Sequence, residues 1–169
     1  NIKFIDSLEK AGLNRINVSV HSLDSLKAKM LFGSDNYDVQ KVIDMLKYIK
    51  NTKIDLWITP VWIPNINDED IKELIKFSKE HSFNIAIQKY ETYQYSRKMK
   101  KSKKINYWKF YKQLEGWEKE FGIKLKFTED DQTILKRKSL PLVFDINEKI
   151  QGVVVSKGWF ENQVIAKAR

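Results

Sequence analysis

Residues 15–24, RINVSVHSLD, constrain the fold of this chain more than any other segment, because apolar and polar residues alternate along them. A helical pattern follows, and the same order of strand and helix recurs twice downstream, which predicts a parallel α/β sheet. Strands in such sheets are usually apolar on both faces, so a polar face indicates a strand that lines a ligand cavity. The apolar positions are Ile16, Val18 and Val20, and the polar positions are Asn17, Ser19 and His21.

Hydrophobic spacing predicts the other elements of the first half. Strands 15–20, 54–61 and 85–89 are predicted to be parallel neighbours, with helices 38–50 and 69–81 covering one face. Shorter helices are expected over residues 3–11 and 25–31. Asn67 and Asp68 are interpreted as N-terminal caps of the helix that begins at residue 69.

The pattern changes after Tyr90. A dense run of cations over 97–104 precedes an amphipathic helix over 106–121 and a short strand over 123–127. After Pro141 the pattern is that of β structure, with a hairpin around Gly158. We therefore predict three parts: a partial parallel (β/α) barrel over residues 1–96, a basic helical linker over 97–139, and the start of a small OB-like β-barrel over 140–169.

The charge of the chain favours a polyanionic partner. Lys and Arg number 31 against 22 Asp and Glu, for a net charge of +9. Nucleic acid is favoured over an anionic membrane surface. The open alternative is a lysine-rich surface of the kind common in proteins from AT-rich genomes.

Several kinds of site and location are excluded or disfavoured by composition. There is no cysteine, so the chain has no disulfide, thiolate nucleophile or cysteine-held cluster. Two histidines, His21 and His81, are too few for a zinc site. No apolar run reaches the roughly 20 residues that span a bilayer, and the first residues are not organised as a signal peptide. We expect a cytoplasmic protein without a membrane partner, and both ends suggest a fragment of something longer.

Two segments carry a resemblance to a known family. Residues 12–24, GLNRINVSVHSLD, resemble the fourth strand of radical S-adenosylmethionine (SAM) enzymes, and residues 58–68, ITPVWIPNIND, resemble the fifth strand and its loop. With YDVQKV at 37–42 between them, the match covers about residues 3–91 in the family's order. The resemblance implies the second half of a partial barrel, with SAM and a [4Fe–4S] cluster at the mouth of the strands, and a 5′-deoxyadenosyl radical that abstracts hydrogen from the substrate.

The same resemblance implies roles for individual residues. Ser19 stands where the family often contacts the methionine part of SAM, and Thr59 stands near the expected ribose, where many members have Asn. Gln88 is expected to face the barrel lumen, because its parity opposes that of the apolar residues beside it. His21 is included among the cofactor-binding candidates, and the open alternative for it is a structural histidine. No catalytic residue is assigned.

The cluster-binding loop of the family, CxxxCxxC, would lie upstream of residue 1. We therefore expect this chain alone to be inactive, with the cluster ligands supplied from elsewhere. An incomplete barrel leaves an open sheet edge, which predicts aggregation or pairing with a second copy. A third reading is an α/β barrel enzyme of another mechanism that uses His21 as a general base.

The second half of the chain points to RNA. Residues 140–159 resemble the TRAM domain of tRNA methylthiotransferases of the same family, so the substrate is predicted to be RNA or a tRNA nucleoside. The competing hypothesis is a binding module without chemistry, and the open alternative for the cationic run is a solvated loop. The predicted nucleic-acid contacts are Arg97, Lys98, Lys100, Lys101, Lys103 and Lys104.

Overall fold

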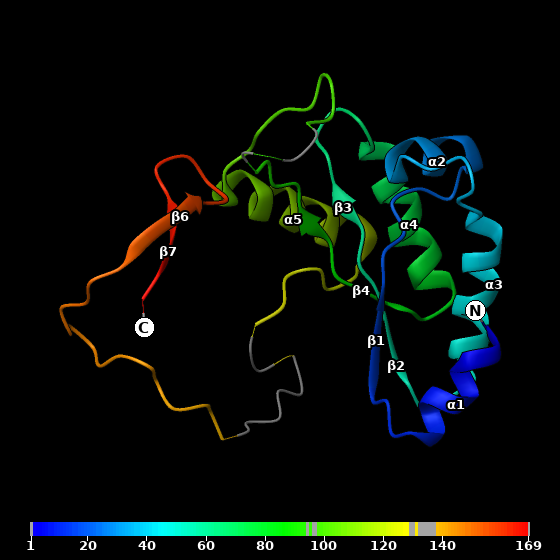
Figure 1. Cartoon of the computed structure of the whole chain (residues 1–169). Coiled ribbons are helices and arrows are strands. Elements are labelled where there is room, and N and C mark those ends of the chain that lie inside the picture. Colours follow the sequence, from blue (N-terminus) through cyan, green and yellow to red (C-terminus); the bar gives the residue numbers. More distant parts are fainter. Residues whose placement is uncertain (1, 94, 96–97, 129–130, 132–137, 169) are drawn as a thin grey trace. The chain divides into compact units, whose positions relative to one another are not determined.

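A computed structural model describes residues 2–93, 95, 98–128, 131 and 138–168 (Figure 1). The chain divides into two compact units, one formed by residues 1–90 and 100–127, the other by residues 91–99 and 128–169. The described helices are too short or too polar to cross a membrane.

The helices of the chain are η1 (Ile2–Phe4), α1 (Ile5–Lys10), α2 (Ser25–Phe32), α3 (Val39–Ile49), α4 (Asp68–Glu80) and α5 (Tyr107–Phe121). The strands are β1 (Arg15–Val18), β2 (Asp55–Ile58), β3 (Val61–Trp62), β4 (Asn84–Ile85), β5 (Gln88–Lys89), β6 (Val153–Lys157) and β7 (Val164–Lys167).

The first unit is built on parallel strands in the order β1-β2-β4, with β3 paired to β5. Ile58 pairs with Ile85, and Val61 pairs with Gln88 in the same register. Each pair of short strands is therefore one longer strand, interrupted at Pro60, which has no N–H for a ladder. The Pro60 carbonyl still accepts from the Gln88 N–H at 2.8 Å. The predicted parallel pairing is confirmed.

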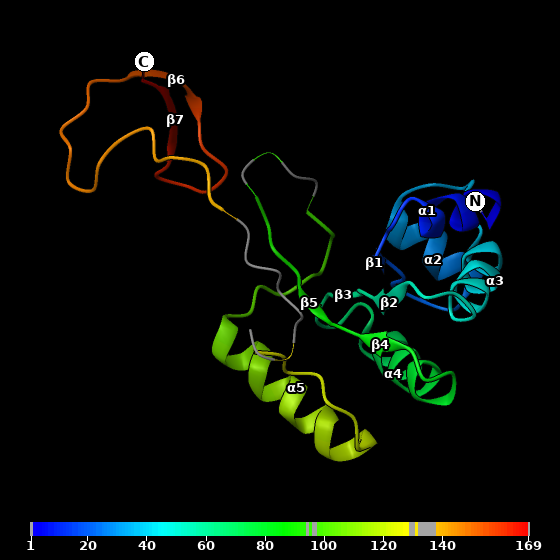
Figure 2. The same cartoon turned by 90° about the horizontal axis from the view of Figure 1, so that it is seen from below.

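Helices α3 and α4 lie on the same side of these strands (Figure 2). Leu46 of α3 and Leu74 of α4 are fully buried and share one core with Ile58 and Ile85 of the sheet. The core forms because the apolar stripe of each helix packs on the face of the sheet that carries the apolar side chains of the strands. The side chains at the alternate positions of each strand point to the other face of the sheet, away from the helices.

Helix α5 joins the first unit through its apolar stripe. Phe110, Leu114 and Trp117 are buried, and Trp117 meets Trp62 of β3 edge-on, with the ring centroids 5.0 Å apart. Aromatic pairs in this arrangement contribute beyond their buried area. The helix is thus held at the far end of the sheet.

The strand predicted over residues 123–127 is wrong. This segment carries no strand, although Leu125 is buried in the core. The N–H groups of Leu125 and Lys126 both donate to Glu118 Oε1 at 2.8 Å. A helix carboxylate therefore satisfies the backbone donors that a sheet would otherwise pair.

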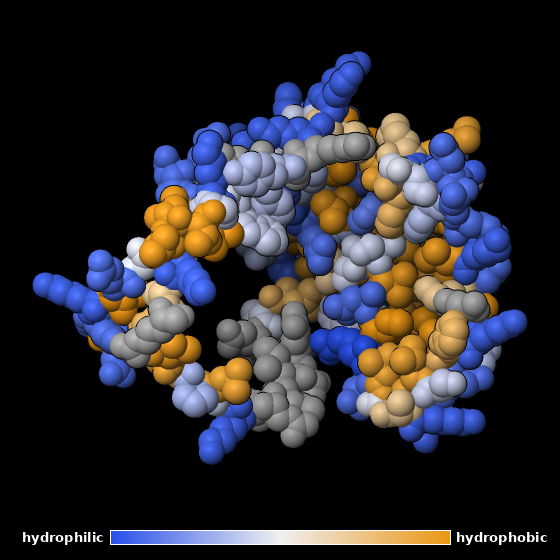
Figure 3. All heavy atoms as spheres, in the orientation of Figure 1, coloured by the Kyte–Doolittle hydropathy of each residue, from blue (hydrophilic) through white to orange (hydrophobic). Residues whose placement is uncertain are grey.

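The second unit contains one antiparallel hairpin, β6 with β7. Its turn needs glycine, because a Cβ added at Gly158 would lie 2.4 Å from the Gln163 Cβ. Tyr93 packs against Trp159 and Phe160 with ring centroids 5.5 and 5.4 Å apart. Apolar side chains of β6 and β7 remain exposed, visible as orange spheres in Figure 3. A two-stranded hairpin of this kind is marginal alone, and the OB-like barrel stays a prediction.

Candidate functional site

The inner face of the parallel sheet carries most of the polar residues predicted to form the site. Paired residues of parallel strands point to the same face. Val18 pairs with Ile58, and the Thr59 N–H donates to the Val18 carbonyl at 2.9 Å. This register places Ser19 beside Thr59, and the β3–β5 pairing places Gln88 one row further toward the carboxyl ends of the strands.

The three predicted residues differ in their access to a ligand. Ser19 and Gln88 are exposed, whereas Thr59 is only 6% exposed. The Ser19 hydroxyl and the Gln88 amide can both donate and accept hydrogen bonds. The carboxyl ends of strands hold the sites of barrel enzymes, and this is the end at which the three residues lie.

His21 is tied to the protein itself. Its Nδ1 accepts the Val61 N–H at 3.1 Å, and its ring stacks on Phe32 with centroids 4.7 Å apart. Burial lowers the pKa of His21 below its usual value. Because Nδ1 is occupied, the proton of the neutral ring lies on Nε2, which can donate to a ligand but has no lone pair to act as a base. The geometry therefore argues against His21 as a general base.

Asn67 is the N-cap residue of α4, as predicted, but its side chain does not make the hydrogen bond of a cap. The residue is fully buried. Its Oδ1 accepts the Ile63 N–H at 2.7 Å, and its Nδ2 donates to the Val61 carbonyl at 2.9 Å. Asp68 is also used otherwise, since it accepts the Trp62 indole N–H at 3.0 Å. Both side chains hold β3: Asn67 pairs backbone groups that the sheet leaves open, and Asp68 fixes the indole of Trp62.

A carboxylate cluster at the opposite ends of the strands escaped the sequence prediction. Asp55 accepts from Arg15 Nε at 2.8 Å, from Trp57 Nε1 at 2.8 Å and from Asn84 Nδ2 at 2.9 Å. Phe127 covers Trp57 edge-on. The cluster joins β1, β2 and β4 where they begin, the end at which barrels carry structural residues. Its only sequence signal is a polar residue at the start of each strand.

The predicted cations fall in different parts of the chain. Arg97 lies outside the described residues, and Lys98 belongs to the second unit. The four remaining lysines are exposed in the first unit, just before α5, and are Lys100, Lys101, Lys103 and Lys104.

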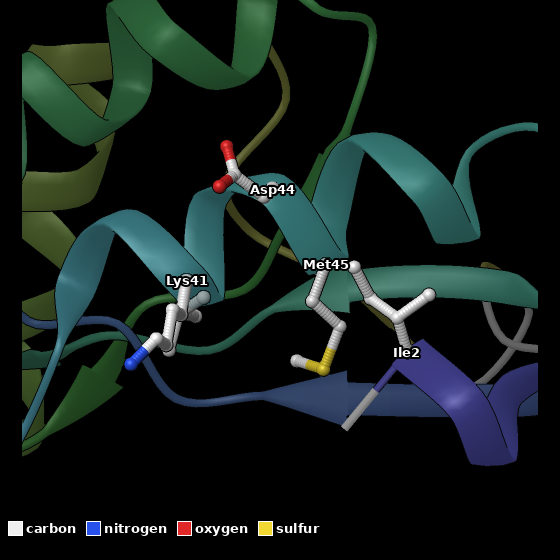
Figure 4. Close-up of a pocket in the computed structure, with 5 residues that line it drawn as sticks. Ile2, Lys41, Asp44 and Met45 are labelled. Carbon is white, nitrogen blue, oxygen red and sulfur yellow. The ribbon is translucent and has the colours of Figure 1, made fainter.

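A hollow of about 600 Å³ lies on the outer side of the first unit, between η1 and α3. Ile2 and Met45 face each other across it, while Lys41 and Asp44 lie at its margin (Figure 4). Its lining includes none of the predicted cofactor residues. The hollow is therefore separate from the polar inner face.

The inner face suits one of the two implied cofactors. Hydroxyl and amide side chains at the carboxyl ends of the strands match the amino, carboxylate and ribose groups of SAM. A [4Fe–4S] cluster does not fit, because the chain has no cysteine and its described residues hold no group of three metal-binding side chains. This chain therefore supplies no cysteine ligand for such a cluster.

Comparison with known proteins agrees with this geometry. Residues 1–78 match the family model of the radical SAM superfamily. The chain is 37% identical over 190 aligned residues to an uncharacterized protein of Methanocaldococcus jannaschii, a match that covers 100% of this chain and 44% of that protein.

Half of the chain also matches enzymes of defined activity. It is 31% identical over 84 residues to the GTP 3′,8-cyclase of Campylobacter jejuni, covering 50% of this chain and 26% of the enzyme. The probable GTP 3′,8-cyclase of Archaeoglobus fulgidus is 32% identical over 87 residues, covering 48% of this chain and 27% of the enzyme.

Parallel strands with helices packed on one face define an α/β protein with a parallel sheet. Residues 1–78 are the part of the chain that matches the radical SAM superfamily. It spans less than half the length of the relatives described above.

Proposed function

We propose that this chain is the substrate-facing part of a radical SAM enzyme that modifies RNA. The observation that carries the proposal is the superfamily match over residues 1–78 together with the polar face that the same residues build. SAM held at this face would supply hydrogen-abstraction chemistry once a reduced cluster bound outside this chain gave it an electron. The residues of this chain bind and orient SAM and the substrate.

Ser19 and Thr59 hold the cofactor in this proposal. They lie side by side on neighbouring strands, so two hydroxyls can reach one ligand. Gln88 is exposed on the same face, nearer the carboxyl ends of the strands, and its amide orients either SAM or the substrate. Thr59 is nearly buried, so its hydroxyl contributes only where the ligand enters deeply between the strands.

The cofactor role is tested by removing the hydroxyls in an enzyme whose cluster has been reconstituted. Ser19→Ala and Thr59→Val are each expected to weaken SAM binding several-fold, because a neutral hydrogen bond contributes about 0.5–1.5 kcal/mol. Calorimetric titration measures the affinity. The control is Val18→Ala, which removes core volume on the opposite face and should lower stability while leaving affinity unchanged. Loss of binding in Val18→Ala alone would reverse the assignment of the strand's faces.

RNA is the proposed substrate because of charge. The net charge of +9 and the exposed lysines before α5 favour a polyanion. The C. jejuni and A. fulgidus relatives are named for an enzyme that cyclises GTP, which makes a purine nucleoside a reasonable target within a longer RNA. The same relatives favour free GTP as the second candidate, and competition between GTP and tRNA for the reconstituted enzyme separates the two.

The lysine run is tested through the salt dependence of tRNA binding. Replacing Lys100, Lys101, Lys103 and Lys104 together by Gln should reduce the slope of log affinity against log salt by about 3, if each lysine neutralises one phosphate. The control carries the same charge change at exposed lysines on other elements, Lys10, Lys47, Lys53 and Lys76. Equal slopes for the two variants would make the run a solvated loop.

A further inference from the structure

Helix α5 presents a second, aromatic face that flanks its buried stripe. Tyr107, Trp108 and Tyr111 are 58%, 65% and 48% exposed. Residues spaced by three and four are neighbours on a helix surface, and the rings of Tyr107 and Tyr111 stack with centroids 6.3 Å apart. Three exposed aromatic rings therefore lie together on one face of α5, and contiguous exposed apolar groups of this kind mark interaction sites.

Cations surround this aromatic face. Lys112 Nζ lies 4.8 Å from the centre of the Trp108 ring, and Lys89 Nζ lies 4.8 Å from that of Tyr107. Residues 100–112 contain six lysines and no acidic residue. The positive charge of this face therefore favours a ligand that carries negative charge.

The surface beside the rings is hollowed. A depression of about 410 Å³ is lined by Trp108, Tyr111, Lys112, Glu115 and Lys126. Its one carboxylate, Glu115, lies 3.2 Å from Lys119 Nζ and 3.8 Å from Lys126 Nζ, and these lysines hold the pKa of Glu115 below its usual value. The hollow is therefore lined by π faces and by a net positive charge.

We propose that this face of α5 is a stacking platform for the unpaired bases of single-stranded nucleic acid. Aromatic rings provide the stacking surface, and lysines spaced along the same helix contact the phosphates. Charge distinguishes this ligand from an apolar protein partner, because an apolar surface offers no negative groups to complement the lysines, and the one carboxylate of the hollow, Glu115, is already paired with Lys119 and Lys126. The inference deepens the proposed RNA substrate and rests on it for biological role, but not for the binding itself.

The test measures binding of a labelled oligouridylate of about 12 nucleotides to the 169-residue chain by fluorescence anisotropy. Trp108→Ala and Tyr111→Ala should each weaken binding about 5- to 150-fold with an unchanged salt slope, because each removes a stacking partner. Lys112→Gln should instead reduce the salt slope by about 0.7, the contribution of one phosphate on a single strand.

Matched controls decide between stacking and general surface effects. Phe4→Ala removes a ring that is 62% exposed on η1, and Lys47→Gln removes an exposed cation on α3; both should bind like the parent. A duplex of the same length should be insensitive to Trp108→Ala, since its bases are already stacked. Unchanged affinity in Trp108→Ala, or an equal loss in Phe4→Ala, overturns the proposal. Binding needs neither cofactor nor turnover, so this result is independent of the SAM titration.

Discussion

At the scale of single residues, side chains replace backbone hydrogen bonds where β1 ends and β3 begins. The Val61 N–H donates to His21 Nδ1, and the Val61 carbonyl accepts from Asn67 Nδ2. Buried backbone groups must be paired. The side chains of His21 and Asn67 pair the Val61 backbone at the point where β1 no longer runs beside it. A structural use of this kind is also why His21 is less suited to proton transfer.

Protonation of His21 is expected to destabilise the fold. Its folded-state pKa is lowered by burial, so the unfolded chain binds the proton more readily, and stability depends on pH through this difference. The contribution is fully present above the unfolded value of about 6.5 and is lost as the pH falls from there toward the folded-state pKa. Urea unfolding at about pH 8 and about pH 5 measures the loss.

The matched variant is His21→Gln, whose amide oxygen can accept the Val61 N–H at either pH. Subtracting its pH dependence from that of the parent removes the effect of other groups. If the variant loses as much stability as the parent over the same interval, His21 is not the group responsible.

At the scale of elements, α5 uses its two faces differently, and paired tryptophan variants measure this. Trp117 is buried against Trp62, whereas Trp108 is exposed. Trp117→Ala is expected to cost about 3–5 kcal/mol of unfolding free energy, because it leaves a cavity in the core. Trp108→Ala should change stability by no more than about 0.5 kcal/mol. Chemical denaturation measures both, and similar costs would mean that the faces are misassigned.

The elements themselves were largely predictable because periodicity reports burial. The alternation of residues 15–20 and the stripes of α3 and α4 predicted parallel strands with helices on one face, as the structure has them. Residues 123–127 have a similar apolar pattern but form no strand, because the Glu118 carboxylate accepts hydrogen bonds from two of their backbone N–H groups. A long-range side-chain bond of this kind leaves no local pattern.

The candidate site was predictable only in part, for the same reason. Parity placed Ser19 and Gln88 on the inner face, where both are exposed. It could not reveal that Asn67 bonds to the backbone of β3, or that Asp55 gathers donors from three strands. The Asp55 contacts depend on strand register and the Asn67 contacts depend on the path of the loop after β3, and the pattern of a single strand contains neither.

At the scale of the whole molecule, the open edge of the sheet is the feature with the largest consequence. Among the described strands, β1 pairs with β2 alone. The carbonyls of Asn14 and Val18 accept from β2, so the backbone of Asn17, at the opposite parity, points its N–H and C=O to the open edge. Unpaired edges template association with another chain, and we propose that, in the 169-residue chain by itself, this edge pairs with a second copy.

Asn17→Pro tests this proposal directly. Proline removes the outward N–H and is tolerated on edge strands, while the bonds between β1 and β2 come from its neighbours and remain. The weight-average mass of the parent in sedimentation equilibrium should rise with concentration, whereas that of Asn17→Pro should stay at the monomer value. Asn17→Ala keeps the N–H and should associate like the parent, which separates the edge from the side chain. A parent that remains monomeric at every concentration, or a proline variant that associates equally, would show that the edge of β1 is not what brings two copies together.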